Sequence, residues 1–124
     1  MACLPTRKLV PFAFLLSFVV HLQSCGGSNP VETINVSLKN TEVYQYPTVG
    51  GDEDGARISI QAKHYSTSEI RRNAETHWIA VYTYQPAAGF VGSDYVDIEI
   101  LTGSDGASLP TNVKKVAFHF DIHD

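Results

Sequence analysis

Cysteine is nearly absent from this chain of 124 residues, and the two that occur, Cys3 and Cys25, both lie near the N-terminus. No disulfide can therefore form within residues 26–124. A domain of this size without disulfides has to be stabilised by a hydrophobic core of its own. The sequence excludes a small disulfide-stapled scaffold.

Basic residues are also few. Of the 9 Lys and Arg residues, Arg7 and Lys8 belong to the N-terminal segment, which leaves 7 against 13 Asp and Glu, a net charge of −6 for the rest of the chain. A domain with this balance has no electrostatic attraction for phosphate groups. We therefore expect no binding to nucleic acid and no attraction to anionic lipid headgroups.

Recognisable catalytic motifs are missing as well. The sequence contains no Gly-x-Ser-x-Gly nucleophile turn and no glycine-rich phosphate loop, and its Glu and His residues are dispersed without a diagnostic spacing. These absences lead us to predict that the chain is not an enzyme.

The N-terminal segment has the composition of a processed signal. After Arg7 and Lys8, the run from Leu9 to Leu22 is almost wholly apolar. As a helix it would span about 21 Å, short of the roughly 30 Å hydrocarbon core of a bilayer. A basic start, a short apolar run and small residues at its end are typical of a cleaved signal peptide.

The end of this segment, Leu22-Gln23-Ser24-Cys25, resembles the lipobox of bacterial lipoproteins. The resemblance implies that residues 1–24 are a signal peptide and that Cys25 becomes the lipidated first residue of the mature chain. The glycine-rich residues up to 31 then form a flexible tether. We expect a lipid-anchored protein of the bacterial cell envelope. Gly26, where some bacteria use Asp for retention, favours the outer membrane. An ordinary secretory signal is the alternative.

Apolar residues in the rest of the chain mostly alternate with polar ones, which predicts β-strands with one buried face. The runs with this pattern, or apolar on both faces, are Thr33–Leu38, Val43–Tyr46, Arg57–Lys63, His77–Tyr84, Val96–Ile100 and Lys115–Ile122. Ser66-Thr67-Ser68-Glu69 has the spacing of a helix capping box, so we expect one or two helical turns there, ending near Arg72. About six strands in 100 residues predict an all-β fold, a single antiparallel β-sandwich over residues 32–124.

The segment from Tyr84 to Asp94 resembles a motif of bacterial Ig-like and cadherin-like repeat domains, Tyr-x-Pro-x-x-Gly-Phe-x-Gly-x-Asp. The resemblance implies an Ig-like sandwich and a role in adhesion, spacing or interaction. The residues themselves favour architectural roles. Gly89 and Gly92 can take positive φ in a tight crossover, and Phe90 can close the end of the core. Asp94 can accept hydrogen bonds from backbone amides of the turn.

Two groups of side chains are candidates for metal binding. His119, Asp121 and His123 share one face of a strand at successive distances of about 6.5–7 Å, and they could hold Zn²⁺ or Cu²⁺ with His64 or His77 as a fourth ligand. The acidic residues in two glycine-rich loops, Asp52-Glu53-Asp54 and Asp105, could bind Ca²⁺. In both cases an ordinary solvated surface is the alternative.

Aromatic residues offer a further possibility. Trp78, Tyr82 and Tyr84 fall on one face of a predicted strand, as a platform for sugar rings would require. The same alternation fits the buried core of a sandwich, which we favour. Tyr44, Tyr46 and Tyr65 are alternative members of a surface patch.

Together these observations lead us to expect an envelope lipoprotein, anchored through lipid on Cys25. Its Ig-like domain acts as a non-catalytic module that binds a protein partner or a surface ligand. The alternatives are a structural or adhesive surface module, or a lipoprotein that binds metal or glycan.

Overall fold

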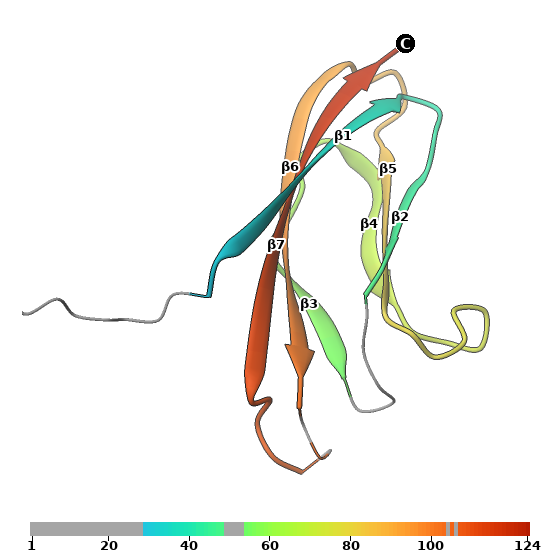
Figure 1. The fold of residues 1–124 in the computed structure, drawn as a ribbon. Coiled ribbons are helices and arrows are strands. Elements are labelled where there is room, and N and C mark those ends of the chain that lie inside the picture. Colours follow the sequence, from blue (N-terminus) through green and yellow to red (C-terminus); the bar gives the residue numbers. More distant parts are fainter. Residues whose placement is uncertain (1–28, 49–53, 104, 106) are drawn as a thin grey trace, which may run out of the picture.

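The fold is all-β, as the alternating sequence pattern predicts (Figure 1). The computed structural model describes residues 29–48, 54–103, 105 and 107–124, and these contain strands and no helix. The predicted signal peptide and Cys25 lie outside the described residues. The strands are β1 Val31–Lys39, β2 Tyr44–Pro47, β3 Gly55–Ile60, β4 Tyr65–Arg71, β5 Val81–Pro86, β6 Gly92–Thr102 and β7 Asn112–His123.

The strands form two sheets, with the orders β1-β7-β6-β3 and β2-β5-β4. All neighbouring pairs are antiparallel except β1 and β7, which run parallel in register from Val31 opposite Lys115 to Lys39 opposite His123. The first two strands therefore belong to different sheets, and the chain passes from one sheet to the other between them (Figure 1).

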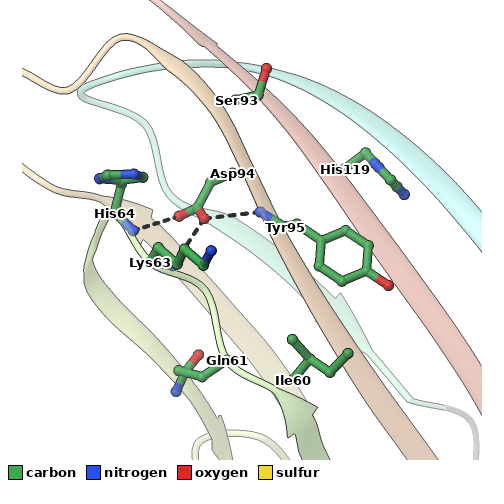
Figure 2. Close-up of a pocket in the computed structure, with 8 residues that line it drawn as sticks. All are labelled: Ile60, Gln61, Lys63, His64, Ser93, Asp94, Tyr95 and His119. Atoms are coloured by element: carbon green, nitrogen blue, oxygen red, sulfur yellow. Dashed lines mark hydrogen bonds between the residues drawn. The ribbon is translucent and has the colours of Figure 1, made fainter.

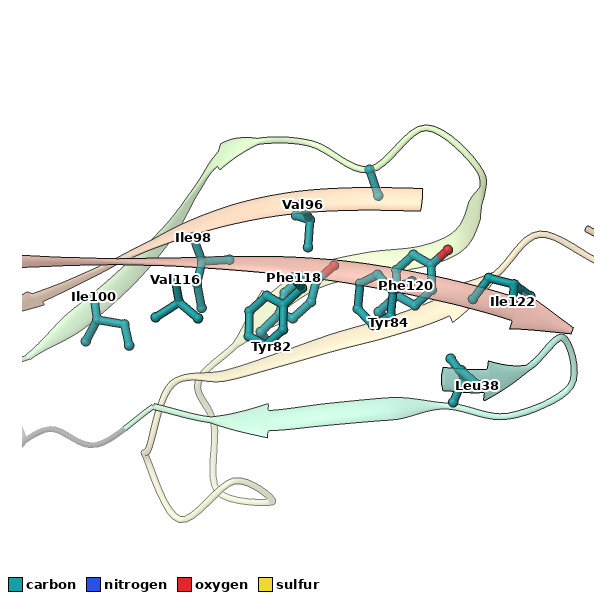
Figure 3. Packing of buried hydrophobic residues seen from close by; sticks show 11 residues of the cluster. Leu38, Tyr82, Tyr84, Val96, Ile98, Ile100, Val116, Phe118, Phe120 and Ile122 are labelled. Atoms are coloured by element: carbon teal, nitrogen blue, oxygen red, sulfur yellow. The ribbon is translucent and has the colours of Figure 1, made fainter. Parts of the chain in front are cut away.

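The core lies between the sheets and is built around four aromatic rings (Figure 3). Tyr82 of β5 stacks on Phe118 of β7 with 5.5 Å between ring centroids, and Tyr84 stacks on Phe120 at 4.0 Å. All four are at most 2% exposed, and aliphatic residues of β6 and β7 fill the space around them. Burying one such side chain contributes on the order of 2 kcal/mol, so this cluster takes the place of absent disulfides.

The predicted helix near Ser66 is wrong, because this segment forms strand β4. Ser68 is buried opposite Tyr84, and its hydroxyl lies 2.9 Å from the Tyr82 hydroxyl and 2.6 Å from Gln61 Oε1. Those partners satisfy a polar residue at an inward position of a strand. The capping-box pattern does not decide the local structure, because pairing with β5 provides backbone hydrogen bonds to this segment.

Two predicted strand boundaries are also corrected. The strand expected from His77 begins only at Val81, because His77 and Trp78 have φ values of 51° and 63° and belong to a turn. The strand expected to reach Lys63 ends at Ile60, where its register with β6 shifts. The turn before β5 and the segment after β3 both belong to the candidate site.

Candidate functional site

The three residues predicted to bind metal lie on the outer, solvent-facing side of β7. His119 is opposite Tyr95 of β6, and the two rings meet edge to face at 4.8 Å. His123 instead makes a local contact with the carbonyl oxygen of Asp124 at 3.1 Å. Within residues 29–48, 54–103, 105 and 107–124, no group of three or more His, Cys, Asp or Glu side chains could hold a metal ion. The face thus does not bring His119, Asp121 and His123 into a coordination site.

The other two histidines considered as ligands are elsewhere. His64 stacks on Phe90 with ring centroids 4.2 Å apart and an angle of 6°. His77 lies in the turn before β5, with positive φ. Neither residue joins the group on β7.

The carboxylates of the predicted calcium loops are already bonded to backbone amides where the structure describes them. Asp54 Oδ1 accepts a hydrogen bond from the Gly103 amide at 3.1 Å. Asp105 Oδ1 accepts from the amides of Ala107 and Ser108, as in an Asx turn. Asp52 and Glu53 lie outside the described residues. These turns use their carboxylates to fix the backbone.

The predicted aromatic platform divides into two parts. Tyr82 and Tyr84 are fully buried, which confirms the core interpretation for them, whereas the same interpretation is wrong for Trp78, which is 61% exposed. Tyr44 and Tyr46 place their ring edges against Phe118 and are part of the packing around the core. Tyr65, at the start of β4, is exposed.

Asp94, the last residue of the Tyr84–Asp94 motif, accepts more hydrogen bonds than the predicted cap of its own turn. Its Oδ1 accepts from the amides of Lys63 and Tyr95, both at 2.9 Å, and its Oδ2 accepts from the His64 amide at 2.8 Å and the Tyr84 hydroxyl at 3.0 Å. The carboxylate therefore fastens the β3–β4 connection to β6. Burial by itself raises the pKa of Asp94, but the four hydrogen bonds outweigh burial and lower it.

The two glycines of the motif have the predicted backbone conformation. Gly89 has φ of 73° and Gly92 has φ of 138°. Phe90 lies between them and packs against the core cluster and His64. We call this part of the molecule, with Tyr84, Phe90, Asp94 and the 63–64 segment, the closed end.

A groove of about 590 Å³ lies beside β6, where β3 ends and the chain turns toward the second sheet (Figure 2). It is lined by Ile60, Gln61, Lys63, His64, Ser93, Asp94, Tyr95 and His119. Both oxygens of Asp94 are already bonded to two donors each, so this carboxylate forms part of the groove wall and is not free to act as a base.

At the opposite end of the fold the chain passes from β2 to β3, from β4 to β5 and from β6 to β7 (Figure 1). We call the described residues of these three connections, 48, 54, 72–80, 103, 105 and 107–111, the loop end. Hydrogen bonds join all three. Arg72 donates from Nε to the Trp78 carbonyl and from Nη1 to the Asp54 carbonyl, both at 2.6 Å, and Asp54 in turn accepts from Gly103. These bonds link described residues of the three connections through Arg72 and Asp54.

The β4–β5 turn within the loop end is braced although its backbone is strained. The Asn73 amide donates to Thr76 Oγ1, and the Thr76 amide donates to Asn73 Oδ1. Across this turn, His77 and Trp78 both take the left-handed backbone region, which costs a residue with a side chain on the order of 1 kcal/mol each. Such strain persists only where the surroundings enforce it.

Apolar side chains are exposed in two of these connections. Trp78 is 61% exposed, Ile79 41% and Leu109, in the β6–β7 connection, 87%. Sequence reasoning missed this surface because an apolar run suggested a strand. The turn-forming pair Asn73 and Thr76, just before that run, was the signal that could have revealed it.

The chain enters the fold close to the loop end. Asn29 Nδ2 donates to the carbonyl oxygen of Val113, the second residue of β7, at 2.6 Å. This bond fixes the N-terminal segment beside the base of the β6–β7 connection.

Among the described residues there is no helix that is long and apolar enough to cross a membrane.

Comparison with known proteins gives no family. The sequence matches no family description and no curated protein. Two solved structures are similar in part. An endo-fucoidan hydrolase of glycoside hydrolase family 107 has a TM-score of 0.47 and 13% identity over 73% of this chain. A cysteine protease inhibitor from Entamoeba histolytica has a TM-score of 0.39 and 10% identity over 75% of this chain and 95% of its own.

The prediction that the chain is not an enzyme does not stand, because the absence of known motifs does not exclude catalysis. The exclusion of catalysis from missing motifs is withdrawn. The chain spans only 12% of the hydrolase, so the likeness assigns no reaction to it.

Proposed function

We propose that this protein is a lipoprotein of the bacterial cell envelope, held by lipid on Cys25, whose single Ig-like domain is an interaction module. Its recognition surface is the loop end. The anchor rests on the lipobox Leu22-Gln23-Ser24-Cys25 and on the basic and apolar segment before it.

The strand order supports an Ig-like domain. Ig domains have one sheet with the order of strands B, E and D and a second with C, F and G. The sheets β2-β5-β4 and β7-β6-β3 follow that order, and β1 adds in parallel to the edge of the second sheet. The motif from Tyr84 to Asp94, with its glycines and its Asp94 bonds, supports the same assignment.

One observation carries the choice of the loop end. Trp78, the only tryptophan of the chain, is 61% exposed on a backbone with positive φ that Arg72 and the Asn73–Thr76 pair hold in place. A large aromatic side chain on a rigid surface gives up little conformational entropy on binding, and tryptophan is enriched among residues that dominate binding energy. Strain of this kind is a reason to infer function.

The anchor is tested by mass spectrometry of the N-terminal peptide from the membrane fraction. We expect a peptide that begins at Cys25 and carries the mass of its lipid. A Cys25→Ser variant should keep its signal peptide and lose the lipid. A mature chain that begins elsewhere, without lipid, would contradict the anchor.

The recognition surface is tested by a photo-crosslinking amino acid in place of Trp78 in living cells. The matched control carries the same group in place of Tyr65, an exposed aromatic residue at the start of β4, away from the loop end. We expect a crosslinked product, with either a protein or a lipid, for position 78 and none for position 65. No product at position 78, or equal products at both, would exclude the loop end as the recognition surface.

A further inference from the structure

The path of the chain into the fold limits how far the loop end can lie from the lipid on Cys25. Asn29 is fixed beside Val113 by its 2.6 Å hydrogen bond. From Cys25 to Asn29 there are four residue steps, which reach at most about 14 Å when fully extended. The lipid attachment point is therefore confined to the neighbourhood of the base of β7.

That base is also the position of the loop end. β7 begins at Asn112, directly after the connection that carries Leu109. The hydrogen bonds from Gly103 to Asp54 and from Arg72 to Asp54 extend the same surface to Trp78. The C-terminus lies at the other end of β7 (Figure 1), so Asn29 and the connections that carry Trp78 and Leu109 are at the same end of the fold.

We infer that the loop end lies against the lipid surface that holds the anchor, with Trp78 and Leu109 in the headgroup region. This inference rests on the proposed lipidation of Cys25. The bilayer itself is then the partner that the loop end contacts.

The chemistry of the exposed side chains fits that occupant. Tryptophan accumulates at membrane–water interfaces, where its ring is apolar and its N–H reaches polar groups. Leu109, 87% exposed, is a side chain that water solvates poorly and acyl chains solvate well. A short tether also raises the effective concentration of the surface, so that weak contacts suffice.

Charge decides which lipid surface suits the loop end. Its acidic side chains include Glu75 and Asp105, and the net charge of the mature chain is negative, so anionic headgroups are repelled. Apolar contact with a zwitterionic surface is not opposed in this way. The test therefore uses phosphatidylethanolamine and phosphatidylcholine.

Because Trp78 is the only tryptophan, its fluorescence reports on this contact directly. The full lipidated protein is reconstituted into vesicles of those two lipids, with or without bromine on the acyl chains of the phosphatidylcholine. We expect emission shifted to shorter wavelength and quenching by the brominated lipid. The matched control places the reporter away from the loop end, as Tyr65→Trp in a Trp78→Phe background.

Quenching of Trp78 should exceed that of the tryptophan at position 65 by about twofold or more, since only an interfacial side chain approaches the acyl chains. Equal quenching at the two positions would overturn the inference. So would a crosslink from position 78 to a protein without quenching, which would leave the proposed function standing. An N-terminal peptide without lipid would instead remove the proposed anchor, and the inference with it, before any vesicle is made.

Discussion

The closed end and the loop end each contain a chain reversal with residues of positive φ, and the two reversals use different residue types. At the closed end the left-handed positions are glycines, Gly89 and Gly92. In the β4–β5 turn of the loop end they are His77 and Trp78, whose side chains strain that conformation, whereas the β6–β7 connection again has a glycine, Gly103, with φ of 76°. The reversal at the closed end avoids backbone strain, whereas the β4–β5 turn accepts strain and exposes the Trp78 side chain.

Polar groups show the same contrast. The buried carboxylate of Asp94 accepts four hydrogen bonds, and the Tyr84 hydroxyl is one of the donors. The loop end is held by surface bonds from Arg72 and Asp54 while its apolar residues face solvent. Removing the Asp94 carboxylate and removing the strained side chains of His77 or Trp78 should therefore change stability in opposite directions.

The largest effect is expected for Asp94→Ala. The substitution leaves the amides of Lys63, His64 and Tyr95 without the acceptor that they share. We expect the free energy of unfolding to fall by about 3 kcal/mol. Urea unfolding followed by circular dichroism measures this loss. Ser93→Ala, on the exposed face of the same strand, is the control and should change it by less than about 0.5 kcal/mol.

The second prediction concerns pH. The folded-state pKa of Asp94 lies below its usual value near 3.8, so its contribution is complete above that value and is lost as the pH falls through the lower, folded-state pKa. Urea titrations from pH 7 to pH 2 should show the wild-type free energy of unfolding falling most steeply below pH 4. In Asp94→Asn that fall should be shallower. Parallel curves for the two proteins would assign the acid sensitivity to other groups.

The third prediction is a destabilisation by Gly92→Ala. Gly92 has φ of 138°, and an added Cβ would lie 3.3 Å from Cζ of Phe90. We expect a loss of about 1–2 kcal/mol in the free energy of unfolding, from backbone strain and displacement of the ring. Thermal unfolding checks it. Gly55→Ala, where the added Cβ meets no atom within 4 Å, is the matched control.

The smallest effect has the opposite sign. Trp78→Gly removes a side chain that is mostly exposed and relieves the strain at φ of 63°. The free energy of unfolding should rise by up to about 1 kcal/mol. His77→Gly should act in the same direction. A clear destabilisation by both variants would show that the turn depends on these side chains, and the contrast between the two ends would then be incorrect.

Sequence periodicity was sufficient for most strands and for the core. Alternation placed Val116, Phe118, Phe120 and Ile122 on the inner face, where they are buried. The glycine conformations followed from the Tyr84–Asp94 motif. These features depend on residues near one another in the chain, so a local pattern carries the information.

The features that sequence reasoning missed depend on distant partners. Ser66–Glu69 has the pattern of a helix start, but pairing with β5 makes this segment a strand. The sequence pattern predicts Trp78 as a core residue, but bonds from Arg72 and within the Asn73–Thr76 pair hold it in a turn. Asp94 bonds amides 30 and 31 positions away, which no local rule anticipates.

The parallel pairing of β1 with β7 has a mechanical consequence. With the lipid anchor that we propose on Cys25, the chain would be held before Val31, at one end of the pair, while β7 ends at His123, at the other. A force that pulls the anchor and the C-terminus apart would slide the two strands along each other, and the hydrogen bonds from Val31–Lys115 to Lys39–His123 would share the load and break together. A domain loaded in this direction resists extension better than one whose bonds open one after another.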